Sequence, residues 1–78
     1  MQQDLEIAIK RVIADVLDLD PNAVHDETSM DNTPKWDSAN HIRLVLALEE
    51  EFSVSFDVTE IESMLSYFDI VQAVQSKH

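Results

Sequence analysis

The chain has 78 residues, no cysteine and no glycine, and its 16 acidic and 5 basic side chains give a formal net charge of −11. We therefore expect a single domain over residues 1–78, without disulfides, zinc–thiolate sites or glycine-rich phosphate-binding loops. The negative charge disfavours binding to nucleic acid and to anionic lipid, so proteins with basic surfaces are the expected partners.

The first predicted helix covers residues 4–17. Asp4 is a suitable N-cap, because its carboxylate can accept a hydrogen bond from the first helical turn. The Asp20-Pro21 pair should end the helix, because a residue before proline avoids the helical conformation. Apolar residues spaced three and four apart predict one buried face, made of Leu5, Ala8, Ile9, Val12, Ile13 and Val16.

Residues 21–37 show no sustained periodicity and predict a long loop. A loop of this length is uncommon in a small domain and often has a function. We expect some of its apolar residues, Val24, Met30 and Trp36, to hold it against the core. For Trp36, packing is a better interpretation than stacking on a ligand.

The second predicted helix covers residues 38–52. Its expected buried stripe consists of Ile42, Val45, Leu46, Leu48 and Phe52, with Ala39 near the start. Leu44 falls off this stripe and is expected to be partly exposed.

The C-terminal third predicts two more helices. Residues 53–56 alternate but are too few for a sheet. A short helix over 58–64 should be capped by Asp57, and a last helix over 67–76 by Ser66, with Asp69 completing a variant capping box. The apolar side of the last helix should be Ile70, Val71 and Val74, with Tyr67 or Phe68. The predicted fold is all-α, a small four-helix bundle with three main helices, one short helix and a long loop between the first two main helices.

The Asp37-Ser38 pair at the start of the second helix has two interpretations. Either residue can simply cap the helix. Alternatively, the Ser38 hydroxyl carries a phosphate ester, which the positive end of the helix dipole would favour. The run from Glu49 to Glu51 opposes the same dipole at the other end, which indicates either a solvated surface or a binding role.

His41 lies one turn after Ser38, so a hydrolase-like triad with Asp37 is a third hypothesis. The chain is too small to build a substrate pocket and an oxyanion hole around three residues of one segment. We therefore expect His41 to be exposed to solvent. His25 and His78 show no ligand spacing with it, so no metal site is predicted.

The stretch "DSANHIRLVLALEEEF" resembles the second helix of acyl carrier proteins, and "VIADVLDLDPNAV", "DETSMDN" and "FDIVQAV" resemble other parts of that family. The resemblance implies a non-catalytic, monomeric carrier. Its 4′-phosphopantetheine would be attached to Ser38 by a phosphopantetheinyl transferase and would hold acyl or aminoacyl groups as thioesters. Asp37 would be the motif neighbour of this site. The resemblance further implies that Leu46, Glu49 and Glu50 contact acyl-loading and acyl-processing enzymes.

The chain also departs from the family pattern. Ala39 replaces the leucine of the motif, and Asn40 and Arg43 make the recognition surface less negative. These departures favour a specialised stand-alone carrier, with Ala39 and Arg43 as partner-contacting positions. The alternatives are a helical interaction module without the prosthetic group, or an aminoacyl or peptidyl carrier rather than a fatty-acyl carrier.

Three further expectations concern location and cargo. No apolar run is long enough to span a membrane, and the printed sequence shows no export-signal pattern, so a cytoplasmic location is expected. The pathway, whether fatty-acid or secondary-metabolite biosynthesis, stays open, as does the length of the acyl chain. Met64, Ile42 and Leu46 could line an acyl cavity, although ordinary core packing is the stronger interpretation.

Overall fold

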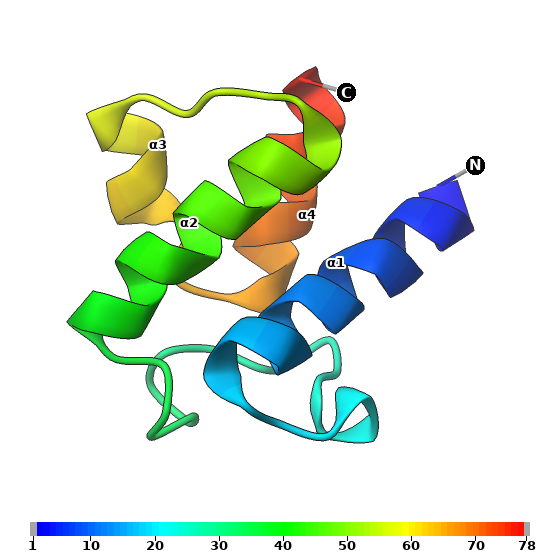
Figure 1. Ribbon diagram of the computed structural model, residues 1–78, viewed down its shortest axis with the longest axis vertical. Coiled ribbons are helices and arrows are strands. Elements are labelled where there is room, and N and C mark those ends of the chain that lie inside the picture. Colours follow the sequence, from blue (N-terminus) through cyan, green and yellow to red (C-terminus); the bar gives the residue numbers. More distant parts are fainter. Residues whose placement is uncertain (1, 78) are drawn as a thin grey trace.

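The computed structural model describes the backbone of residues 2–77 and the side chains of residues 4–77. Its elements in chain order are α1 (Gln2–Leu17), a 3-10 turn η1 (Pro21–Ala23), α2 (Ser38–Phe52), α3 (Val58–Ser63) and α4 (Tyr67–Lys77). Figure 1 shows that the long α1–α2 loop lies at the end of the bundle opposite the N-terminal end of α1, so the first residue of α2 is found there. The predicted four-helix, all-α architecture is confirmed. Among residues 2–77, no helix is both long and apolar enough to cross a bilayer.

Helix α1 begins two residues before the predicted start, so Asp4 is not its N-cap. Asp4 instead lies within the first turn, where its carboxylate still faces the positive end of the helix dipole. At the other end, Asp18 adopts a left-handed conformation with φ 56°. The N–H of Leu19 then donates to the carbonyl of Ala14 at 2.8 Å. The helix therefore ends just ahead of Pro21, as predicted.

Helix α2 ends in the same way, at Ser53 with φ 54°. The N–H groups of Ser53 and Val54 both donate to the carbonyl of Glu49. A left-handed residue after the last helical turn is usually glycine, because a Cβ atom is crowded in that conformation. In this glycine-free chain, aspartate and serine take those two positions.

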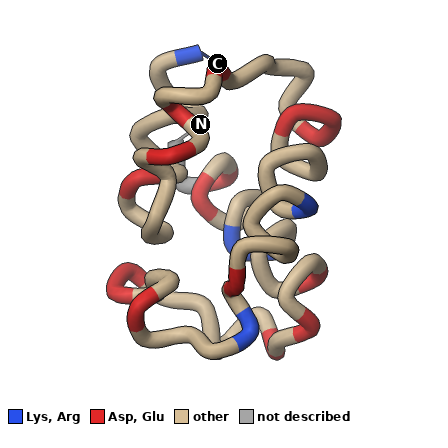
Figure 2. The backbone as a smooth tube through the Cα atoms, turned by 90° about the vertical axis from the view of Figure 1, so that its left-hand side faces the viewer, with Lys and Arg blue, Asp and Glu red and all other residues tan. Residues whose placement is uncertain are grey.

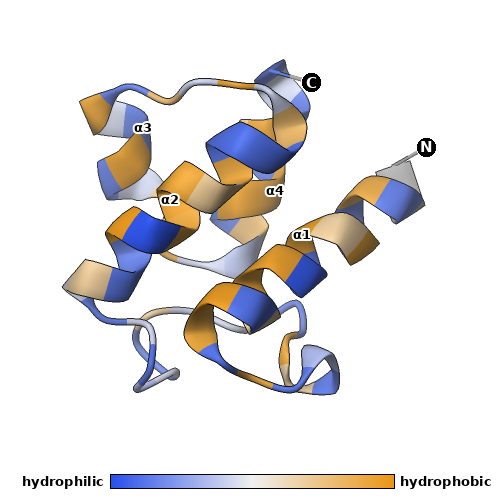
Figure 3. Ribbon diagram, viewed as in Figure 1, coloured by the Kyte–Doolittle hydropathy of each residue, from blue (hydrophilic) through white to orange (hydrophobic). Residues whose placement is uncertain are grey.

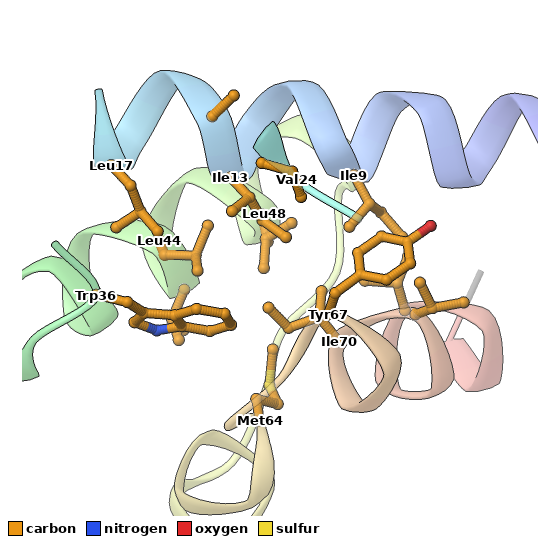
Figure 4. Close-up of a cluster of buried hydrophobic side chains, with 14 of the residues drawn as sticks. Ile9, Ile13, Leu17, Val24, Trp36, Leu44, Leu48, Met64, Tyr67 and Ile70 are labelled. Atoms are coloured by element: carbon orange, nitrogen blue, oxygen red, sulfur yellow. The ribbon is translucent and has the colours of Figure 1, made fainter. Parts of the chain in front are cut away.

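The core is built from three helices and the loop. Nine large side chains are fully buried: Ile9, Ile13, Leu17, Trp36, Leu44, Leu48, Met64, Ile70 and Val74. Figure 4 shows α1, α2 and α4 converging on this cluster, with Trp36 and Val24 entering from the loop. Val24 and Trp36 are buried and Met30 is half-buried against the core, so the prediction that these residues hold the loop is confirmed.

The predicted buried face of α2 is confirmed at Val45 and Leu48 and is wrong at Ile42, Leu44 and Leu46. Leu44 is fully buried, whereas Ile42 and Leu46 are 54% and 59% exposed. Ala39 is exposed as well, and Phe52 is half-buried. The true buried positions follow a spacing of three, one and three residues, and they are His41, Leu44, Val45 and Leu48. The prediction failed because α2 carries apolar residues on several sides, while its buried face begins with a histidine.

The predicted caps Asp57 and Ser66 are both present, and the reciprocal capping box is shown for α3. Asp57 and Glu60 form a reciprocal capping box, with bonds of 2.8 and 3.1 Å between backbone N–H and carboxylate. The N–H of Asp69 donates to Ser66 Oγ at 3.1 Å. Helix α3 ends at Ser63, one residue before the prediction, and α4 extends one residue further, to Lys77.

The loop is joined to the α3–α4 connection. An isolated antiparallel bridge pairs Ser29 with Ser66. Beside it, the N–H of Met30 donates to the carbonyl of Leu65, and the N–H of Tyr67 donates to the carbonyl of Thr28. These bonds place Tyr67 in the core and leave Phe68 62% exposed, which decides between the two aromatic residues proposed for the apolar side of α4.

Stability should fall in alkaline solution because of Tyr67. Burial of the phenol, with the nearby carboxylates of Glu6 and Asp26, raises its pKa from 10.0 to about 12. Above pH 10 the unfolded chain loses the phenol proton while the folded chain keeps it, so the free energy of unfolding decreases as pH rises towards 12. The expected loss is roughly 2–3 kcal/mol, measured by urea unfolding at several pH values. Tyr67→Phe is the control, and an equally steep loss in that variant would assign the effect to other groups.

Candidate functional site

Ser38 is the first residue of α2, and its side chain is exposed. Asp37 is the N-cap, in an extended conformation with φ −101° and ψ −177°, and its Oδ1 accepts a hydrogen bond from the N–H of Asn40 at 2.9 Å. Its carbonyl accepts from the N–H of His41 at 2.8 Å. Among residues 2–77, the N–H groups of Ser38 and Ala39 make no hydrogen bond. An accessible hydroxyl therefore lies beside two open donors at the positive end of a helix, an arrangement that suits a phosphate ester.

The turn before Ser38 is fixed from both sides. The N–H of Trp36 donates to the carbonyl of Thr33 at 2.9 Å. The side-chain amide of Asn40 donates to the carbonyl of Lys35 at 2.8 Å. Lys35 Nζ reaches the end of α1, donating to the carbonyl of Asp18 at 3.0 Å and lying 3.9 Å from its carboxylate. Ser38 is thus presented from a turn tied to both α1 and α2.

His41 is buried, with 8% exposure, and the expectation that it faces solvent is wrong. Its Nδ1 accepts a hydrogen bond from Trp36 Nε1 at 3.1 Å. Because an indole N–H can only donate, Nδ1 carries no proton, and Nε2–H donates to the carbonyl of Ile61 at 2.9 Å. Both ring nitrogens are therefore engaged away from Ser38. The hydrolase-like triad is not formed.

The predicted partner-contacting residues of α2 are mostly on one exposed surface. Ala39, Arg43, Leu46 and Glu50 are all exposed and are spaced three or four residues apart, so they follow one side of the helix. Ile42 belongs to the same side. Figure 3 shows apolar and polar residues alternating along α2. We call this surface, made of Ala39, Ile42, Arg43, Leu46 and Glu50, the outer face of α2.

Glu49 differs from the other four predicted positions. It is half-buried, and its Oε2 accepts a hydrogen bond from the N–H of Phe56 at 2.9 Å. Together with the bonds to its carbonyl, this contact fixes the chain as it leaves α2. The unfavourable position of Glu49 near the negative end of the helix dipole is thus compensated by a structural bond. Glu50 and Glu51 remain exposed.

Two further expectations concern cavities and metals. Met64 is 1% exposed and belongs to the core, while Ile42 and Leu46 lie on the solvent side of α2, so these three residues do not line a common cavity. Within residues 2–77, no three His, Cys, Asp or Glu side chains come together as a metal ion would require.

Sequence reasoning missed three contacts at the site, made by Lys35, Asn40 and the Trp36–His41 pair. The Asn40 and Trp36–His41 contacts join the loop to α2, and the Lys35 contact joins the loop to the end of α1. The available signal was the single tryptophan five residues before a histidine on the core side of α2. Periodicity alone does not reveal such a pair, because it does not count histidine as a core residue.

A four-helix bundle with an exposed serine at a helix N-terminus, after a long loop, has the architecture of a carrier domain for a covalent prosthetic group, and the comparisons with known proteins support this class. The family model described as "Phosphopantetheine attachment site" matches residues 8–74 of the chain. An acyl carrier protein from Thermosynechococcus vestitus is 32% identical over 76 residues, covering 97% of this chain and 94% of the relative. One from Campylobacter curvus is 34% identical over 67 residues, covering 86% and 87% respectively. The chain belongs to the acyl carrier protein family.

A solved structure agrees with this assignment. The solution structure of a holo acyl carrier protein from Geobacter metallireducens superposes with a TM-score of 0.80 at 27% identity, over 90% of this chain and 80% of that one. The prosthetic group of the family is covalently bound 4′-phosphopantetheine, and carrier proteins of this kind are in general not catalysts. They interact in general with phosphopantetheinyl transferases and biosynthetic enzymes.

Proposed function

We propose that Ser38 is the attachment residue and that the chain is a non-catalytic shuttle for acyl or aminoacyl thioesters. The observation that carries the proposal is the exposed Ser38 hydroxyl at the start of α2, beside the open N–H groups of Ser38 and Ala39. These groups favour the negative charge of a phosphodiester. Asp37 has a different role, because its carboxylate already accepts a bond from Asn40 and so holds the start of the helix.

The attachment reaction is a phosphoryl transfer from coenzyme A. Ser38 Oγ forms a bond to the phosphorus next to pantetheine, the bond from that phosphorus to adenosine 3′,5′-bisphosphate breaks, and the serine proton passes to a base of the transferase. The bound arm supplies the thiol that holds the cargo, which this cysteine-free chain does not have itself. The fixed turn at Lys35 and Asn40 keeps the hydroxyl accessible to the transferase.

Intact-protein mass after incubation with coenzyme A and a broad-specificity phosphopantetheinyl transferase tests the attachment site. The wild-type chain should gain the mass of one phosphopantetheine group, and Ser38→Ala should gain nothing. Ser55→Ala, which changes another exposed serine, is the matched control and should be modified like the wild type. An unmodified wild-type chain with several transferases would refute the carrier proposal, and a gain in Ser38→Ala would assign the arm to another residue.

The outer face of α2 is the proposed docking surface for the transferase and for acyl-loading and acyl-processing enzymes. It combines exposed apolar side chains at Ile42 and Leu46 with the charges of Arg43 and Glu50. Acidic positions predominate along the whole chain in Figure 2, so enzymes with basic surfaces would be attracted over a distance. Glu49 contributes charge to this end of α2, but its bond to Phe56 means that replacing it also disturbs the fold.

Other parts of the interpretation stay predictions. These are the single domain over residues 1–78, the monomeric state and the cytoplasmic location. The same holds for a specialised pathway. The specialised pathway is supported by Ala39 and Arg43, which place a small side chain and a cation on the outer face of α2.

Reversal of the charge at Glu50 should slow transfer of cargo to a partner enzyme. Glu50→Lys is expected to lower the rate by up to about fivefold at low salt, the size of an exposed ion pair, with a smaller effect at high salt. Glu51→Lys is the matched control, because it changes the net charge equally but lines a groove with Arg11 and Val12 of α1. Equal slowing by both variants would contradict docking at the outer face and leave only a net-charge effect.

A further inference from the structure

The strongest feature outside the docking surface is a pair of buried rings from two residues that flank Ser38 in the sequence. Trp36 precedes Ser38 by two residues and His41 follows it by three, and their exposures are 2% and 8%. The ring centroids are 6.2 Å apart with an interplanar angle of 29°, and the indole N–H donates to His41 Nδ1. The two buried side chains thus form one hydrogen-bonded unit, joined to the start of α2 within one helical turn of Ser38.

This unit also joins three elements. Trp36 belongs to the loop and His41 to α2, and His41 Nε2–H donates to the carbonyl of Ile61 in α3, which lies beside α2 in Figure 1. The next layer of the core contains Leu44 and Met64, which are 0% and 1% exposed. In Figure 4, the Trp36 ring extends from the loop into the core in the vicinity of these two side chains. The core at the Ser38 end of α2 therefore contains a hydrogen-bonded pair of rings in place of purely apolar side chains.

We propose that Trp36 and His41 form a plug that keeps the cargo of Ser38 outside the bundle, so that the carrier is suited to short or polar acyl groups rather than long alkyl chains. This inference rests on the proposed function. An alkyl chain entering beside Ser38 would have to displace the indole. It would leave the Trp36 N–H, both nitrogens of His41 and the Ile61 carbonyl buried without partners, and an alkyl chain cannot hydrogen-bond to any of them. A purely apolar core has no such penalty when it repacks.

The test uses the intact chain loaded at Ser38 with acetyl, butyryl, octanoyl or dodecanoyl groups from the matching coenzyme A thioesters, and with alanyl as a polar cargo. Melting temperature is measured for each species, together with the fluorescence emission of Trp36, the single tryptophan. We expect the same melting temperature for every cargo and unchanged emission from a buried indole. A melting temperature that rises stepwise with chain length, with a change in Trp36 emission, would show that the chain enters the core and would overturn the inference.

A variant series sharpens the result. Trp36→Leu removes the indole and should allow entry, so its melting temperature should increase from acetyl to dodecanoyl. Tyr67→Phe, a core change away from the plug, is the matched control and should behave like the wild type. If Trp36→Leu proves unfolded, the wild-type series still decides. Intact mass reports loading separately, so a wild-type chain that fails to load counts against the proposed function, whereas a loaded chain with length-dependent stability counts against the plug alone.

Discussion

Replacement of Trp36 by alanine is expected to be among the most destabilising single changes in the chain, with a loss of about 3–5 kcal/mol in the free energy of unfolding. The indole is 2% exposed, and its removal leaves a cavity and also leaves His41 Nδ1 without its donor. A domain of this size typically has a total stability of roughly 4–12 kcal/mol. The loss would therefore leave the fold marginal. Urea unfolding followed by circular dichroism measures it, because the variant lacks the fluorescent reporter.

Trp36→Phe separates the two contributions. The phenyl ring keeps much of the buried apolar area but has no N–H, so the remaining cost is that of an unsatisfied buried acceptor, about 1–3 kcal/mol. A loss under about 1 kcal/mol for Trp36→Ala would mean that the site collapses around the missing ring or that the loop is not held by Trp36.

The second large effect contrasts two leucines that are two residues apart on α2. Leu44→Ala is expected to cost about 2–5 kcal/mol, because the side chain is fully buried. Leu46→Ala should stay within about 0.5 kcal/mol of the wild type, because that side chain is 59% exposed. The same unfolding measurement checks both variants. Loss of stability in Leu46→Ala but not in Leu44→Ala would mean that α2 packs with the face predicted from the sequence.

The leucine pair also separates stability from function. Leu46 lies on the outer face of α2, so Leu46→Ala should weaken docking while the fold stays intact. Leu44 has no such role. Helix α2 thus presents Ser38, the proposed attachment residue, at its first position. It packs one side against the core and leaves the other, the proposed docking surface, exposed. The charged residues of its last turn are divided similarly, since Glu49 bonds to Phe56 and Glu50 stays exposed.

The turn before Ser38 illustrates how this chain builds its site without glycine. Lys35 and Asn40 hold the turn by side-chain contacts to α1 and to the loop carbonyl. Trp36, buried in the core and bonded to His41, also holds the turn. The departure from the usual family pattern at Asn40 therefore has a structural basis. The departures at Ala39 and Arg43 lie on the outer face of α2, the proposed docking surface.

The sequence by itself was sufficient to predict the four helices and most of their ends, and it singled out Ser38 as the proposed attachment residue. These features depend on local chemistry: apolar spacing along α1, the Asp20-Pro21 stop, and the caps at Asp37, Asp57 and Ser66 act within a few residues. The tertiary structure alone decided which side of α2 is buried, why His41 lies in the core, and that Glu49 has a structural bond. Apolar residues occur on several sides of α2, so periodicity could not select one. The deciding partners lie 5, 20 and 7 residues away, in Trp36, Ile61 and Phe56, and only folding brings them within hydrogen-bonding distance.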